Sequence, residues 1–168
     1  MPSTTSIQNE IIQQANAQGV PSSIALRVAQ EESGFNPNAV GSSGELGVFQ
    51  LLPSSFPGQP IDDLDSNISI GISYLKQLYN QFGDWATAIA AYNAGPTRVA
   101  NGNIPASTQN YVQSVLSNAG GIPPDDSGST IDAPVTDLSA TFGLDSISPD
   151  VLVPAVIGGA ALLIWLLD

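Results

Sequence analysis

The distribution of apolar residues is the feature that most constrains how this chain can fold. Residues 151–167 are 17 consecutive uncharged, mainly apolar positions without a polar face. A helix of that length spans about 25 Å, the short end of what crosses the hydrocarbon core of a bilayer. A buried core helix is the alternative, but this segment follows a polar linker. We therefore expect a single C-terminal transmembrane helix over 151–167, with the lipid bilayer as its partner.

The segment before it, residues 118–150, has the composition of a linker. It is rich in Gly, Pro, Ser and Thr, and it holds six Asp and no basic residue. Such a segment buries too little apolar area to offset the entropy of ordering its backbone. We expect an extended acidic linker, which leaves residues 1–117 as the folded domain.

Composition excludes several classes of function. Lys and Arg together number 3 against a net charge of −12, so a nucleic-acid partner is not expected. Without His or Cys there is no disulfide, thiol nucleophile, Ser-His-Asp triad or zinc site. Residues 63–67 begin like a calcium loop, but Ile68 stands at the glycine position. We expect no metal and no cofactor, and any catalysis must use carboxylates, hydroxyls or tyrosines.

Within residues 1–117, apolar residues recur at helical spacing in five segments, which predicts a mainly α domain. The turn-rich stretch 35–64 is predicted to hold a small sheet or a short helix, which would make the fold α+β. The residues predicted to start or stop the helices are Gly19, Pro21, Gly83, Asp84, and Ser107 or Thr108.

Glu32 is the candidate for acid chemistry. It follows Ile24 and Val28 at intervals of four and so extends the apolar stripe of its helix, whereas Glu31 lies one turn after Arg27 on the solvated side. Burial disfavours an ionised carboxyl, so the pKa of Glu32 should rise and make it a general acid near neutral pH. Spacing alone equally allows a glutamate that merely ends a helix.

Three motifs make the domain recognisable. Residues 32–39 (ESGFNPNA), 47–53 (GVFQLLP) and 91–96 (AYNAGP) resemble the soluble lytic transglycosylase family, which has a lysozyme-like catalytic domain. The resemblance covers residues 8–117. It implies cleavage of peptidoglycan glycan strands between N-acetylmuramic acid (MurNAc) and N-acetylglucosamine (GlcNAc). The implied reaction is not a hydrolysis and leaves a 1,6-anhydro-MurNAc end.

The resemblance also implies roles for individual residues. Glu32 would protonate the glycosidic oxygen and then, as a carboxylate, take the proton of the muramoyl O6 as it attacks C1. Because the substrate supplies the nucleophile, one carboxyl suffices. The residues that match substrate-binding positions of the family are Ser33, Gln50, Tyr92, Asn93 and Tyr111.

Glu45 departs from the family pattern, in which its position is commonly small. It is either a second carboxylate in the cleft or a loop charge that faces solvent. In the first case, Glu32 and Glu45 could hydrolyse the same bond through a water molecule, as in a muramidase. The remaining alternative is a structural membrane or virion protein that binds glycan without cutting it.

The N-terminus has neither a basic region nor an apolar run, so we expect no signal peptide. A wall-cutting domain on a C-terminal anchor suits the membrane or delivery apparatus of a bacteriophage particle. There it would act in the bacterial periplasm during genome entry, with virion membrane or capsid proteins as partners. A bacterial tail-anchored enzyme is the competing expectation.

Overall fold

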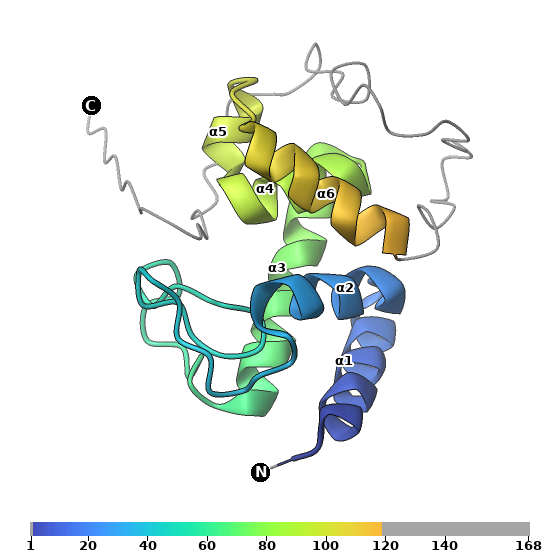
Figure 1. Cartoon of the computed structure of the whole chain (residues 1–168), viewed down its shortest axis with the longest axis vertical. Coiled ribbons are helices and arrows are strands. Elements are labelled where there is room, and N and C mark those ends of the chain that lie inside the picture. Colours follow the sequence, from blue (N-terminus) through green and yellow to red (C-terminus); the bar gives the residue numbers. More distant parts are fainter. Residues whose placement is uncertain (1, 119–168) are drawn as a thin grey trace.

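The computed structural model describes residues 2–118. This part of the chain folds into helices joined by short turns and one long irregular segment (Figure 1). The helices are α1 (Thr4–Gln18), α2 (Ser22–Ser33), α3 (Leu64–Phe82), α4 (Trp85–Ala94), α5 (Pro96–Ala100) and α6 (Ala106–Asn118).

Most helix ends lie where the sequence predicts them. Gly19 and Gly83 follow α1 and α3 in the left-handed conformation, at φ 66° and 85°. The Asp84 side chain accepts the N–H of Thr87 at 2.8 Å and caps α4 as predicted. The Asp63 side chain caps α3 in the same way, by accepting the N–H of Ser66 at 3.0 Å. Side-chain caps and glycine stops are local signals, which is why sequence alone locates them.

In the second half of the domain one expectation is wrong and one helix was missed. The last helix begins at Ala106, so neither Ser107 nor Thr108 is its cap; instead the Thr108 hydroxyl donates a hydrogen bond to Asn93. The short helix α5 was not predicted. It begins at Pro96, whose ring fixes a helical φ at a position that needs no N–H donor.

The stretch 35–63 contains neither the small sheet nor the short α-helix expected there. Its regular pairing is limited to two isolated bridges, Val40 with Leu46 and Leu46 with Leu51. Gly44 and Gly47 take positive φ values of 90° and 72°, which turn the chain too often for a strand to extend. The described residues therefore form a mainly helical fold with one irregular lobe.

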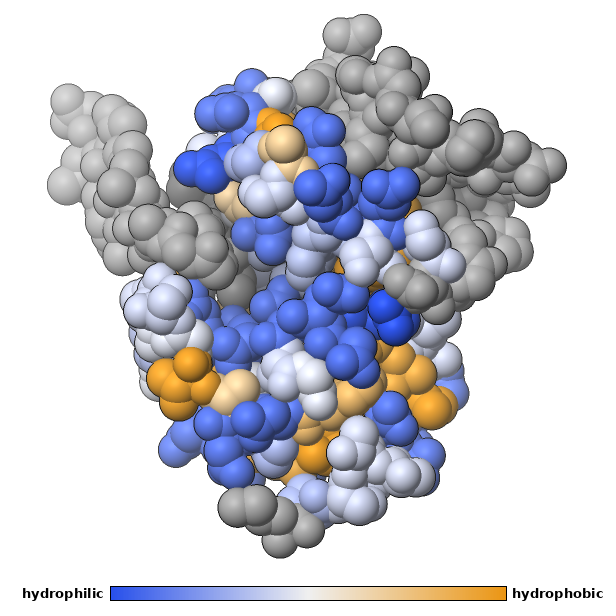
Figure 2. Space-filling view, in the orientation of Figure 1, coloured by the Kyte–Doolittle hydropathy of each residue, from blue (hydrophilic) through white to orange (hydrophobic). Residues whose placement is uncertain are grey.

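The long helix α3 runs through the centre of the molecule (Figure 1). It packs against α1 and α4, while α6 lies across α2 although the two are far apart in sequence. The predicted apolar stripes form one core, and Ile11, Ile24, Ile72 and Ile89 have no exposed surface. Hydrophilic side chains make up most of the coloured surface in Figure 2, and its hydrophobic part is split into separate patches.

None of the helices in the described range is long and apolar enough to cross a bilayer. The predicted transmembrane helix over 151–167 lies outside the described residues, as does all but the first residue of the predicted linker.

Candidate active site

Glu32 lies in the last turn of α2, at the end of the stripe formed by Ile24 and Val28. Both of those residues are fully buried, and Glu32 itself is partly buried. Glu31 lies on the other side of the helix, where its carboxylate is 3.4 Å from the guanidinium of Arg27. The predicted division between an inward Glu32 and an outward Glu31 is confirmed.

The chain leaves α2 sharply after Glu32. Gly34 and Phe35 both have positive φ, 61° and 64°, and their N–H groups bond to carbonyls of the last turn. A left-handed conformation at a residue with a side chain costs of order 1 kcal/mol. Burial of the Phe35 ring offsets this strain. The turn leads the chain from the end of α2 into the irregular lobe.

Helix α6 supplies the direct partner of Glu32. The Tyr111 hydroxyl donates to Glu32 Oε1 at 2.7 Å, across 79 residues of sequence. The pKa of Glu32 is raised from 4.5 to about 7. Burial is the largest cause, the Tyr111 hydrogen bond lowers the pKa, and the charges of Glu45 and Glu31 raise it. Glu32 therefore carries a transferable proton near neutral pH.

Tyr111 remains a donor at that pH. Burial and the neighbouring Glu32 raise the pKa of its hydroxyl well above the ordinary value of 10.0. One turn further along α6, the Ser114 hydroxyl donates to Glu31 Oε1 at 2.7 Å. The two neighbouring carboxyls of α2 are thus held by two different residues of α6.

A loop of residues 46–51 lies beside the end of α2, where the Ser33 hydroxyl bonds the carbonyl of Val48. Leu46 and Leu51 exchange backbone hydrogen bonds of 2.9 and 3.0 Å, and the four residues between them make the tip. Gln50 takes a left-handed φ of 46°, and its side-chain amide donates to the carbonyls of Gly47 and Ala39 at 2.9 and 3.3 Å. Gln50 therefore closes its own loop and keeps its Oε1 as an acceptor.

Asn67 of α3 ties this loop to the helices. Its Oδ1 accepts the N–H of Phe49 at 2.9 Å, and its Nδ2 donates to the carbonyls of Leu46 and Ile61 at 2.9 and 2.8 Å. Only 1% of Asn67 is exposed. Its positioning role was not predicted, although a polar residue beside Ile68 on the apolar stripe of a helix is the signal that could have revealed it.

Two residues expected to contact substrate also hold this loop. The Ser33 hydroxyl lies 2.9 Å from the carbonyl oxygen of Val48, and the Tyr92 hydroxyl donates to that of Phe49 at 2.7 Å. Tyr92 is 1% exposed, so it offers little surface to a ligand. Asn93 is partly buried, and its Oδ1 accepts from Thr108 at 2.8 Å.

Glu45 does not face solvent, because only 2% of it is exposed. The N–H of Ser43 donates to its Oε2 at 2.9 Å. A Cβ at Gly41 would collide with the Glu45 carboxylate and would lie 2.8 Å from Gln50 Oε1, so this packing requires glycine at position 41. The solvent-facing alternative is therefore wrong, and the charge of the buried Glu45 raises the pKa of Glu32.

No group of three or more acidic side chains within residues 2–118 is placed to hold a metal ion. Among the residues of the site, Glu32 and Tyr111 are hydrogen-bonded to each other between α2 and α6. Ser33, Tyr92 and Asn67 are hydrogen-bonded to the backbone of the loop. The site can hold a proton near neutral pH beside buried acceptors and amides.

Residues 9–112 match the family model described as the transglycosylase SLT domain. The chain is 39% identical to the soluble lytic murein transglycosylase of Escherichia coli K12, over 48% of this chain and 15% of that protein. It is 33% identical to the membrane-bound lytic murein transglycosylase C of Haemophilus influenzae PittEE, over 48% of this chain and 29% of that protein.

Two solved structures share the fold. The 70 kDa soluble lytic transglycosylase of E. coli superposes with a TM-score of 0.60 and 32% identity. An inactive mutant of the lytic transglycosylase Slt from Pseudomonas aeruginosa gives 0.58 and 31%. Each match covers 66% of this chain and 23% of the other, so this chain corresponds to a small part of each relative. By the extent of the family match, the chain belongs to the transglycosylase SLT domain family.

Proposed function

We propose that this protein is a peptidoglycan lytic transglycosylase in which Glu32 is the general acid and base. The observation that carries this proposal is the partly buried Glu32 carboxyl, whose pKa lies at about 7 and which accepts a hydrogen bond from Tyr111. Family membership supports the substrate class. The inactive P. aeruginosa mutant carries glutamine in place of a glutamate, which agrees with an essential glutamate in this family.

In the proposed reaction, protonated Glu32 gives its proton to the oxygen between MurNAc and GlcNAc as that bond breaks. The resulting carboxylate then takes the proton of the MurNAc O6 hydroxyl, which attacks C1 and closes the 1,6-anhydro ring. A pKa near the working pH suits both steps, because the group must first give and then accept a proton. Tyr111 stabilises the carboxylate between the steps by donating to it.

The other residues then act in two ways. Ser33 and Tyr92 bond backbone carbonyls of the loop of residues 46–51 and so position this loop, which carries Gln50, beside the end of α2. Gln50 Oε1 and the partly buried Asn93 are the groups proposed to bind sugar hydroxyls and acetamides. The expected substrate-binding set thus divides into residues that hold the loop and residues that contact the glycan.

A second candidate is hydrolysis of the same bond. The observation that favours it is the burial of Glu45 within electrostatic reach of Glu32. An inverting glycosidase needs such a second carboxylate to activate a water molecule. In that case the products would carry reducing ends and no anhydro ends.

Digestion of purified peptidoglycan by the full chain, with mass spectrometry of the products, separates these candidates. Anhydro-MurNAc ends are expected, and reducing ends that take up 18O from labelled water would instead establish the muramidase. Glu32→Gln should lower the rate by about 100- to 10,000-fold. The matched control Glu31→Gln should stay close to wild type. A folded protein that yields no products would contradict both candidates and leave glycan binding alone.

Residues 151–167 carry the proposal of a membrane anchor, which rests on their composition. The full chain should remain with the membrane fraction after extraction at alkaline pH, and a chain ending at residue 150 should be released. Release of the full chain would contradict the anchor. A role in phage genome entry, in contact with virion membrane or capsid proteins, stays a prediction.

A further inference from the structure

Helix α6 carries three hydroxyl groups that bond polar side chains of other helices. Thr108, Tyr111 and Ser114 follow one another at intervals of three, so each is a neighbour of the next on the helix surface. Their hydroxyls donate over 2.8, 2.7 and 2.7 Å to side-chain oxygens of Asn93, Glu32 and Glu31, in that order. The bond of Tyr111 belongs to the proposed reaction. The bond of Thr108 ends on a residue that is proposed to bind the glycan, which gives it a different use.

The Thr108 hydroxyl fixes the orientation of the Asn93 amide because it is cut off from solvent. Thr108 is 2% exposed, and within residues 2–118 its hydroxyl finds its acceptor in Asn93 Oδ1 alone. An amide turned the other way would point Nδ2 at the hydroxyl and leave the hydroxyl hydrogen buried without an acceptor, which is unfavourable. Thr108 therefore selects one of the two orientations that the amide plane of Asn93 could take.

The selected orientation decides what Asn93 can offer a ligand. Asn93 lies partly buried in the last turn of α4. Its Oδ1 is occupied by Thr108, whereas its Nδ2 makes no hydrogen bond to any described residue. Gln50 is held the opposite way, because its Nε2 donates to two backbone carbonyls and its Oε1 is left as the acceptor. Of the two amides proposed to contact the glycan, one thus presents a donor and the other an acceptor.

We propose that Thr108 is a positioning residue that turns the NH2 group of Asn93 toward the glycan, where it selects the carbonyl oxygen of an acetamide group. This inference rests on the proposed function for the identity of the ligand. A sugar hydroxyl can bond either end of an amide, so a fixed amide matters most for the acetamide carbonyl, which only accepts. On an N-deacetylated sugar the ammonium group only donates and cannot pair with the NH2 group. Thr108 should therefore disfavour N-deacetylated strands.

Kinetics of the full chain provide the first test. Thr108→Val removes the hydroxyl and keeps the shape of the side chain, so KM for N-acetylated strands should rise about 3- to 10-fold, the equivalent of one lost hydrogen bond, with kcat unchanged. Thr108→Ser keeps the hydroxyl and should restore KM. The matched control Thr87→Val makes the same change at a buried threonine in the first turn of α4 and should alter neither constant. Wild-type KM in Thr108→Val would overturn the role.

Two comparisons separate the orientation of Asn93 from a general loss of packing. Asn93→Ala should raise KM by itself, and Thr108→Val should add nothing to it, because Thr108 acts through Asn93. Additive effects would show that Thr108 only supports the fold. The preference for N-acetylated over chemically N-deacetylated strands should fall about 3- to 10-fold in Thr108→Val. An unchanged preference would contradict the acetamide as the selected group.

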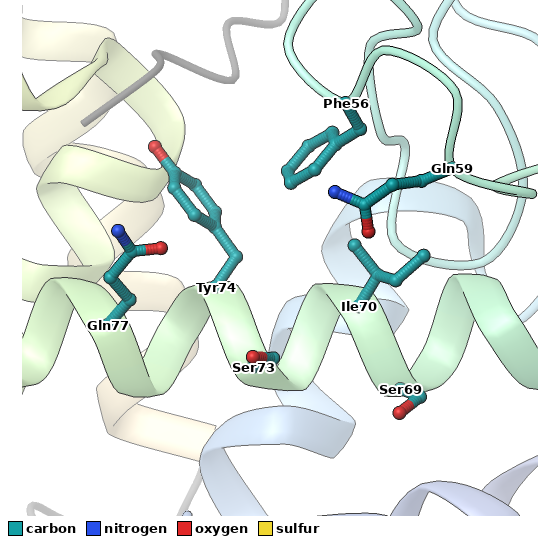
Figure 3. A pocket seen from close by; sticks show the side chains of 7 residues that line it. All are labelled: Phe56, Gln59, Ser69, Ile70, Ser73, Tyr74 and Gln77. Atoms are coloured by element: carbon teal, nitrogen blue, oxygen red, sulfur yellow. The ribbon is translucent and has the colours of Figure 1, made fainter.

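NMR of the full-length chain tests the orientation without relying on activity. The side-chain amide signals of Asn93 should move in Thr108→Val and return in Thr108→Ser. The amides of Gln59 and Gln77 line a groove beside α3 instead, shown in Figure 3, so their signals are the internal control and should not move. Asn93 signals that stay in place would overturn the positioning role. Failure of the unmodified chain to cut peptidoglycan would refute the proposed function, and the NMR result would still decide whether Thr108 orients Asn93.

Discussion

The two walls of the candidate active site are built in different ways. The helical wall, α2 and α6, consists of apolar stripes at helical spacing, and Glu32 and Tyr111 extend those stripes by one polar position each. The loop wall, which is the loop of residues 46–51 with Glu45 directly before it, has almost no regular structure, and side chains that bond the loop backbone hold it in place. The helical wall therefore depends on apolar packing, and the loop wall depends on a few buried hydrogen bonds.

The largest effect should come from removing the polar side chain that holds the loop wall. Asn67→Ala breaks three hydrogen bonds and leaves the Phe49 N–H and the Ile61 carbonyl without partners, whereas the Leu46 carbonyl keeps its bond from the Leu51 N–H. Such losses cost about 1–3 kcal/mol each when a group stays unsatisfied, and relaxation reduces the sum, so we expect about 3–4 kcal/mol of destabilisation. Urea unfolding measures it.

The matched control is Asn80→Ala, which removes an exposed asparagine from the same helix. It should change stability by less than about 0.5 kcal/mol. If Asn67→Ala were as stable as this control, the loop wall would not depend on its buried hydrogen bonds, and the comparison between the two walls would fail.

On the helical wall, burial of the ionised Glu32 carboxyl lowers the stability of the folded protein, and the size of this loss depends on pH. The unfolded carboxyl ionises near 4.5 and the folded one at about 7, so the folded state binds more protons between these values. Stability contributed by this group is therefore lost as pH rises through that window. Glu32→Gln removes the loss, so its stability relative to wild type should grow by about 2 kcal/mol between pH 5 and pH 8.

Urea unfolding of both proteins at the two pH values tests this, since the other titrating groups are common to both. Glu31→Gln is the control, because that side chain is exposed beside Arg27 and should show no comparable growth. A pH-independent difference between Glu32→Gln and wild type would mean that Glu32 is not buried enough to act as an acid at neutral pH.

The same contrast between the two walls explains which features of the fold and the site could be predicted from the sequence. The periods of α1 to α4 and their caps are local, and so is the inward direction of Glu32, because residues four apart share a helix face. The loop wall is set by bonds between residues far apart, such as Tyr92 to Phe49 at a separation of 43. No local pattern encodes them. The family motifs marked Ser33 and Tyr92 as important, but only the structure shows that they bond the loop.

Glu45 and the irregular lobe are the clearest examples of features that the sequence could not predict. A glutamate between Gly44 and Leu46 has the composition of an exposed turn, yet it is 2% exposed. Its burial depends on the missing side chain at Gly41, four residues earlier in an irregular chain, where no periodicity links the two positions. The expected sheet failed because of two other glycines of the same lobe, Gly44 and Gly47, whose positive φ values interrupt extended strands.

A smaller effect should follow from changing the partner of Glu32 on the helical wall. The Tyr111 hydroxyl lowers the pKa of Glu32, so Tyr111→Phe should raise that pKa further. The alkaline limb of the kcat/KM profile should move to higher pH by less than about 1 pH unit, which corresponds to less than about 1.4 kcal/mol of lost interaction with the carboxylate. The turnover rate should also fall, because the carboxylate formed in the first step loses its donor. A limb that moved to lower pH would contradict this assignment.

The smallest effect, opposite in sign, should come from the loop wall. The groups that act on Glu32 are Glu31 on its own helix, Glu45 on the loop, and Tyr111 and Tyr92 on α6 and α4. The Glu45 charge raises the pKa of Glu32 by less than Tyr111 lowers it. Glu45→Gln removes that charge and keeps an acceptor for the Ser43 N–H, so the alkaline limb should move slightly to lower pH.

The matched control is Glu10→Gln, which removes one negative charge from α1, where the side chain bonds only Gln14 among the described contacts. Its pH profile should coincide with that of the wild type. Because the two walls act on one proton in opposite directions, the double variant Tyr111→Phe, Glu45→Gln should fall between the two single variants. A Glu45→Gln protein that stopped cutting at every pH would show instead that Glu45 takes part in the chemistry, and the hydrolytic mechanism would then replace the one-carboxylate mechanism.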